Sequence, residues 1–262
     1  MGHRTSAVPM MGRSAPRHGL GRAVRAQARA AVGDLPLAGV CVAALVLSAS
    51  IGGSVPGDVA AAPDAAKDAI AAPLSTVLAV YAAVMAAIYG SFRYTVDRRG
   101  GVVAQRATLQ PRRWALAARI PFTVLGGAIV GVASLLGGRV ALSAALGVRG
   151  LDPATVGSVA IVGAVAAVWG LSVGLLVQAH LPSLFVAPLS LSAALLVALP
   201  WPAAAAWFPL PTLLRAADLD LAPLGITAAV GPQPAAAVAM ATAWIAAVLT
   251  AGAVSFLRRD LR

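Results

Sequence analysis

The chain has 262 residues, of which 60% are apolar and only 11% are charged, and its mean hydropathy is +0.86. Charged residues make up about a quarter of an average soluble protein, so this composition excludes an ordinary soluble domain and indicates that apolar surface faces lipid. The net charge of +11 would suit a nucleic-acid-binding protein, but the arginines stand in clumps between long apolar runs without interleaved aromatic residues, so we expect no nucleic-acid partner.

The chain begins with a basic segment, 1–34, before the first apolar run. Within 20–32, arginines and apolar side chains fall on different helical faces; the arginines are Arg22, Arg25 and Arg29, and the apolar residues are Leu20, Val24, Ala28 and Val32. This periodicity predicts a short amphipathic helix that lies in the plane of the lipid headgroups. A disordered basic tail that only sets the membrane topology is the alternative, and the pattern favours neither.

Six apolar stretches follow, each close to the length that crosses a bilayer. Because every backbone group in hydrocarbon needs an internal partner, such runs form helices. They are 35–53, 73–92, 114–136, 154–177, 181–199 and 235–257. We therefore expect an all-α integral membrane protein with one six-helix transmembrane domain over 35–257 and a basic C-terminus at 258–262. We interpret the apolar stretch 138–149, which an arginine bounds on each side, as an outer loop or an interfacial helix.

A cleaved signal peptide is the alternative for the first apolar run. Ser48, Ala49 and Ser50 would provide a cleavage site of small residues, but the leader before the run is long for a signal peptide. The single cysteine, Cys41, lies within the run, so no disulfide can form within the chain. We expect the run to remain as the first span.

The basic residues predict the orientation of the spans. Six of them precede the first span, seven surround the loop between spans two and three, and three end the chain, whereas the alternate loops hold only Lys67, Arg139, Arg149 and Arg215. Since cytoplasmic loops carry the excess of arginine, both termini and Val103 are predicted inside, with Ala61 and Leu219 outside. The bias toward Ala, Gly, Arg and Pro is typical of GC-rich bacterial genomes, so we expect a bacterial plasma (inner) membrane protein.

Motifs of catalysis are scarce in the sequence. It contains no G-x-x-x-x-G-K-[ST] phosphate loop, no H-E-x-x-H and no C-x-x-C. We therefore expect no enzymatic activity, cofactor or metal in this chain. The middle of the spans lacks acidic residues, and no inverted repeat is visible, which disfavours a proton-coupled carrier. Gln178 and His180 stand at the inner end of span four, where we interpret them as interfacial side chains.

The loop between spans two and three has the most distinctive pattern. Gly100 and Gly101 interrupt the helix of span two, and Pro111 prevents the next helix from running into span three. Between them, 102–110 is predicted to form a helix of about two turns, with Val102, Arg106 and Leu109 on one face. A short basic helix of this kind suits a cytoplasmic partner; a solvated loop that only sets topology is the alternative.

These residues, in this order, resemble the permease subunits of ABC-2 type ATP-binding-cassette exporters. Such permeases have an acidic residue after span two, a glycine four residues later, a short coupling helix, a Pro-Arg-Arg element and a basic residue early in span three. The matching residues are Asp97, Gly101, Pro111, Arg112, Arg113 and Arg119. The likeness extends to 170–174, 200–211 and 256–260. The chain departs from the pattern at Asp97, Val102 and Arg119, where glutamate, threonine and lysine are common.

The resemblance implies an energy source outside this chain. A separate ATP-binding-cassette ATPase would bind and hydrolyse the ATP, and the permease would pair with a second copy or a sister permease to export an amphiphilic or lipophilic compound. The ATPase would contact a coupling loop made of Asp97, Arg98, Arg99, Gly101, Val102, Arg106, Leu109, Pro111, Arg112 and Arg113. The outer segment 201–217 would form a re-entrant gate that carries Trp201, Trp207 and Phe208; an aromatic belt at the membrane interface is the alternative.

Two other function classes remain open from the sequence. The chain could be a polytopic membrane interaction or regulatory protein that transports nothing, or a carrier that works without ATP. A neighbouring gene for a small ATPase with a phosphate loop would favour the permease over both.

Overall fold

The structure, a computed structural model, describes residues 16–55, 59, 61–147, 150, 152–227 and 231–259. It is 85% helical, and no strand occurs in these ranges. The elements are α1 (Pro16–Ala31), α2 (Leu35–Gly52), α3 (Asp64–Arg99), α4 (Val102–Leu109), α5 (Arg112–Leu146), α6 (Pro153–Val177), α7 (His180–Ala198), α8 (Pro202–Ala205), α9 (Pro209–Ala216), the 3-10 turn η2 (Ala222–Leu224) and α10 (Pro234–Arg258).

Six of the described helices are long and apolar enough to cross a membrane, namely α2, α3, α5, α6, α7 and α10. Each contains one of the six predicted spans or matches it to within one residue, so the prediction of an all-helical chain with six apolar helices of membrane-spanning length is confirmed. At 1.5 Å per residue, α3 and α5 are about 54 and 52 Å long, well beyond the ~30 Å hydrocarbon core of a bilayer. Both helices are therefore longer than the hydrocarbon core that a span has to cross.

The interpretation of 138–149 as a separate loop or interfacial helix is wrong. Helix α5 continues through Arg139 and ends at Leu146, where Gly147 takes a left-handed conformation with φ of 70°. Leu142 and Leu146 are both buried in the hydrophobic core. One arginine does not end a helix whose other side chains keep packing, and the chain turns only at the glycine that tolerates positive φ.

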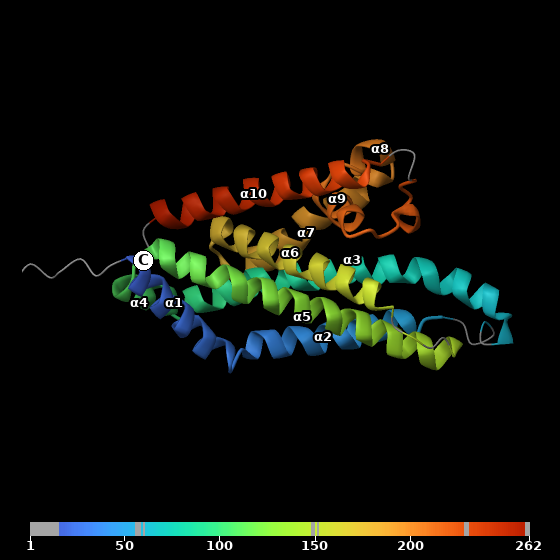
Figure 1. Cartoon of the computed structure of the whole chain (residues 1–262), viewed down its shortest axis with the longest axis horizontal. Helices are drawn as coiled ribbons and strands as arrows, with labels where there is room; N and C mark the ends of the chain where they lie inside the picture. The colour runs from blue at the N-terminus through green and yellow to red at the C-terminus, as the bar shows by residue number, and fades with distance from the viewer. Residues whose placement is uncertain are drawn as a thin grey trace, which may run out of the picture.

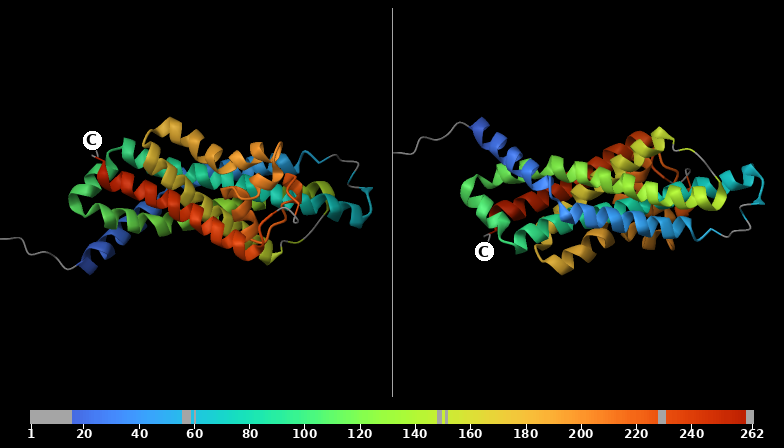
Figure 2. Two further views of the ribbon diagram at one scale, coloured as in Figure 1. Left: turned by 90° about the horizontal axis from the view of Figure 1, so that it is seen from above. Right: turned by 90° about the horizontal axis from the view of Figure 1, so that it is seen from below.

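Helix α6 lies at the centre of the bundle, where it packs against α3, α5, α7 and α10, while α2 covers α3 and α5 (Figures 1 and 2). Small residues bring the central helices close together. A Cβ added at Gly90 of α3 would clash with the carbonyl oxygen of Ala167 in α6, and one at Gly170 of α6 would clash with the carbonyl oxygen of Ala87. Backbones at this separation gain dispersion contacts along their length, which is how apolar helices associate in lipid.

One end of the bundle collects the arginines, and we call it the basic end. It holds α1, the last turn of α3, α4, the first turns of α5 and the end of α10 (Figure 1). Arg112 of α5 donates a hydrogen bond to the carbonyl of Arg259 after α10 (2.9 Å), which joins two arginine clusters distant in sequence. The opposite end, called the far end, carries α8, α9 and η2.

Candidate functional site

The basic end is organised around the turn from α3 through α4 into α5. Helix α3 ends at Arg99 with Gly100 as its C-cap, and Gly101 has a φ of 73°, a left-handed conformation that glycine adopts without strain. Helix α4 then covers Val102–Leu109, where the sequence predicted a helix over 102–110. Gln110 is extended, and Pro111 stands directly before the first residue of α5, Arg112. The glycine pair and the proline thus set both ends of α4.

An ion pair closes the base of this turn. Arg119 of α5 donates to the carboxylate of Asp97 in the last turn of α3. The Arg119 side chain is buried, and its guanidinium carbon lies 5.4 Å from the centre of the Tyr94 ring, which in turn meets Phe256 of α10 edge-on. The structure therefore brings together Asp97 and Arg119, two residues that the family pattern singled out separately.

Helix α4 is fixed to the bundle by Val103, which is only 7% exposed. Val103 belongs to a small hydrophobic cluster with Tyr94, Leu116, Leu171, Leu175 and Phe256, from four other helices. Val102, which the sequence pattern placed on one face with Arg106 and Leu109, is only half-buried. Sequence reasoning assigned Val103 no packing role, although its position away from the exposed polar residues of α4 is a signal for one.

The two other residues of the predicted α4 face differ in exposure. Arg106 is half-buried and lines a small cavity of about 20 Å³ beside Tyr94 and Arg119. Leu109 is 81% exposed at the last residue of α4. A leucine on a rigid, basic turn, with almost no contact to its own chain, is available to a partner.

Helix α1 packs obliquely against the start of α5 (Figure 2). Gly19 of α1 lies against the Trp114 ring, over which the Arg113 guanidinium also stacks at 5.2 Å. Ala23 and Gln27 face the bundle and are buried. Arg22, Arg25 and Arg29 are exposed, as is Val24, whereas Leu20 and Ala28 are half-buried, so α1 keeps its basic face free of protein contacts.

A second buried ion pair joins the α1–α2 connection to α3. The Asp34 carboxylate accepts from Arg93 Nε at 2.7 Å and from the Tyr89 hydroxyl at 3.3 Å, and both ionised side chains are nearly inaccessible to solvent. Asp34 also caps α2 by accepting from the backbone N–H of Leu37. Sequence reasoning missed this pair, because two predicted spans separate its members and only the buried setting of Asp34 shows that it needs a cation.

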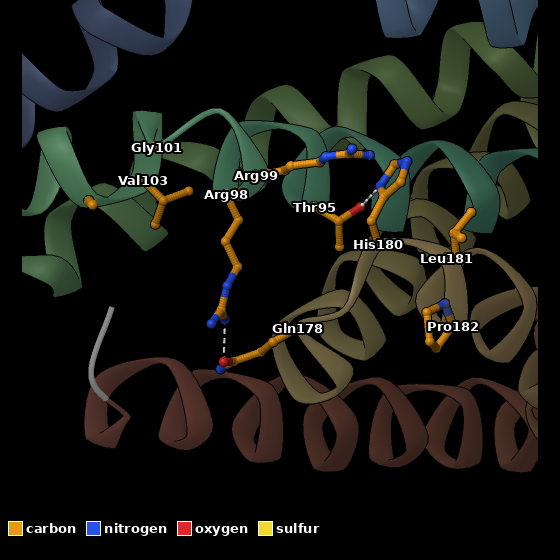
Figure 3. Close-up of a pocket in the computed structure, with 10 residues that line it drawn as sticks. Thr95, Arg98, Arg99, Gly101, Val103, Gln178, His180, Leu181 and Pro182 are labelled. Carbon is orange, nitrogen blue, oxygen red and sulfur yellow. Dashed lines mark hydrogen bonds between the residues drawn. The ribbon is translucent and has the colours of Figure 1, made fainter. Parts of the chain in front are cut away.

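A pocket of about 670 Å³ lies beside α4, between the end of α3 and the α6–α7 turn (Figure 3). Arg98 donates to the Gln178 side chain, and Thr95 Oγ1 lies 2.9 Å from His180 Nδ1. Arg99 lines the same pocket and is exposed. Gln178 and His180 are therefore more than isolated interfacial side chains: they are the contacts through which the α6–α7 turn meets α3.

The far end places the predicted gate aromatics around a buried helix. Trp201 and Trp207 are exposed and Phe208 is half-buried, whereas α9 directly after them is buried from Pro209 to Leu214. Helix α9 packs against α10, α7, α3 and α6, and Trp244 of α10 donates to the Trp207 carbonyl at 3.0 Å. Helix α9 is therefore a short helix enclosed by four longer helices.

No protein-family model matches this chain, and no curated protein or solved structure is significantly similar to it.

Proposed function

We propose that this chain is the membrane-spanning permease subunit of an ABC-2 type ATP-binding-cassette transporter. In this proposal the basic end faces the cytoplasm of a bacterial cell, a separate ATPase binds there, and an amphiphilic or lipophilic compound is exported. The observation that carries the proposal is α4: a short helix with an exposed apolar tip at Leu109, held rigidly at the basic end.

Rigid attachment is what a force-transmitting helix needs. The Asp97–Arg119 ion pair joins α3 to α5 at the base of the turn, and Val103 anchors α4 in the hydrophobic cluster beneath it. A partner that moves α4 would therefore displace α3 and α5 together instead of bending a loop. Coupling by rigid elements of this kind is how a nucleotide-driven closure can bias a transmembrane equilibrium.

The surface of the turn has the composition of a docking site. Leu109 offers an exposed apolar anchor, and Arg113 is an exposed cation in the same loop. Interfaces gain most of their affinity from a few buried anchors, and arginine adds charge-assisted hydrogen bonds. The excess of arginine at this end also supports a cytoplasmic placement.

Two features of the bundle fit a transport path. Helix α9 lies buried among the spans at the far end, as a re-entrant gate would. Helices α2, α7 and α10 leave most of their apolar surface uncovered, which provides room for lipid and for a second permease copy or a sister permease. The path would run between the two permeases.

The direct test is purification of the tagged chain in mild detergent from the membranes of its source organism. We expect the purified chain alone to hydrolyse no ATP, and a protein with a phosphate loop to accompany it and supply ATP hydrolysis. ATP-independent transport by the chain alone in vesicles would make it a carrier. A preparation that contains neither an ATPase nor transport activity would favour a membrane interaction or regulatory protein.

A further inference from the structure

The pocket beside α4 has an unbalanced charge. Its lining includes Arg98, Arg99 and His180, and no carboxylate is among the lining residues. The nearest acidic residue of the turn, Asp97, is already paired with Arg119. A cationic cavity of about 670 Å³ is therefore left without an anion from the described part of the chain.

The pocket still has hydrogen-bond donors to offer. Arg98 uses one nitrogen on Gln178, and a guanidinium has five N–H donors. Arg99 has no hydrogen bond or ion pair with any described residue. Helix α7 begins at His180 without a side-chain cap, which leaves the backbone N–H groups of His180 and Leu181, both in the pocket lining, without a capping partner. Arginine pairs beside a free helix N-terminus suit the oxygens of a phosphate group.

An apolar stripe leads away from the pocket along α7. Leu181 lines the pocket and is 66% exposed, and Phe185 and Leu189 are 66% and 62% exposed. Residues spaced by four share one face of a helix, so the three side chains form a continuous strip. Helix α7 is one of the candidate membrane spans, so the strip runs from the pocket into the bilayer.

We propose that this pocket binds the phosphodiester headgroup of an anionic membrane phospholipid, whose acyl chain lies along Leu181, Phe185 and Leu189. The cations select an anionic headgroup over a zwitterionic one, because no carboxylate in the lining would balance an added positive charge. The stripe selects a lipid over a free phosphate, because only a lipid covers apolar surface. This site is separate from the ATPase contact at Leu109.

Native mass spectrometry of the full chain in detergent tests the proposal, with phosphatidylglycerol, phosphatidylcholine and glycerol 3-phosphate as probes. We expect phosphatidylglycerol to bind most tightly, and Arg98→Gln and Arg99→Gln each to weaken it about tenfold, as the loss of a charged hydrogen bond predicts. Arg99→Gln removes a cation that has no partner among the described residues, so we expect that variant to keep its fold. Arg112→Gln and Arg113→Gln are matched controls outside the pocket and should bind as the unmodified chain does.

The stripe supplies the second half of the test. Phe185→Ser should weaken phosphatidylglycerol binding, whereas Leu45→Ser, at an exposed apolar position of α2, should not. Equal binding of glycerol 3-phosphate with no effect of Phe185→Ser would overturn the lipid assignment in favour of free phosphate. Equal losses in the pocket and control arginine variants would overturn the site itself. Since no ATPase is present, failure of the proposed transport function would leave these results unchanged.

Discussion

The guanidinium of Arg119 in α5 and the carboxylate of Asp97 in α3 form an ion pair at the point where α4 leaves and rejoins the bundle. The Arg119 side chain is 7% exposed and that of Asp97 is 27% exposed. If the ion pair were broken, water could therefore hydrate the Asp97 carboxylate more easily than the Arg119 guanidinium. This asymmetry gives the pair a distinctive mutational signature.

Asp97→Asn should destabilise the protein more than Arg119→Met. The first leaves a buried guanidinium without its counter-ion, a loss of about 3–5 kcal/mol, whereas the second leaves a carboxylate that water partly reaches. The double variant should recover much of the loss. Unfolding by SDS titration in mixed micelles measures the stability of the two single variants and of the double variant. Equal stability of Asp97→Asn and the unmodified protein would contradict a structural role for the pair.

Close packing of α3 on α6 predicts a sharp contrast between two glycines. Gly90→Ala places a Cβ against the carbonyl oxygen of Ala167 and should destabilise the bundle by about 1–3 kcal/mol. Gly157→Ala, at an open position of α6, should stabilise it by about 0.5–1 kcal/mol through the better helix propensity of alanine. The same SDS titration compares them. Similar effects of the two substitutions would argue against backbone contact at Gly90.

The sequence predicted the six spans well because each is a long apolar run, and hydrocarbon leaves such a run no alternative to a helix. The prediction was wrong at 138–149, where the flanking arginines suggested that the helix of span three ends. The helix instead continues to Leu146, because Leu142 and Leu146 are buried in the core. At the site, local pattern located α4. It could not find the Asp34–Arg93 pair or the Arg98–Gln178 contact, because neither the spacing nor the composition of one segment specifies its partner on another helix.

Cysteine labelling tests the placement of the basic end in the cytoplasm. Val103 and Leu219 are both buried and would react poorly as cysteines. The cysteines are therefore introduced at exposed positions, Gln105 for the basic end and Ala61 for the opposite side. In a Cys41→Ser background, an impermeant reagent should label Ala61→Cys in intact cells and Gln105→Cys only after permeabilisation. Labelling of Gln105→Cys in intact cells would reverse the orientation.

The cap of α6 predicts a pH effect outside the spans. The backbone N–H of Ala154, followed by the Thr155 hydroxyl and N–H, lowers the pKa of Asp152 below its ordinary value. Because the folded pKa is the lower one, the stabilisation is complete above the ordinary carboxyl pKa of about 4 and is lost as pH falls through the lowered value. Asp152→Ala should slightly lower Tm near neutral pH and weaken its dependence on acid. Unchanged Tm–pH profiles would show that the cap contributes nothing.

The central claim is that α4 binds a separate ATPase through Leu109. Leu109→Asp would bury an unpaired carboxylate in that contact and should weaken binding by about 2–4 kcal/mol, at least roughly 30-fold. Ala104→Asp is the matched control, since Ala104 is also exposed on α4 but lies about 140° around the helix from Leu109. Neither residue lies in a span, so both variants should insert normally.

The deciding measurement is the amount of ATPase that co-purifies with each variant, normalised to the amount of chain recovered from the membrane. The permease account predicts that the unmodified chain and Ala104→Asp retain the ATPase and its ATP hydrolysis, while Leu109→Asp loses most of both. Full retention of the ATPase by Leu109→Asp would contradict the coupling role of α4.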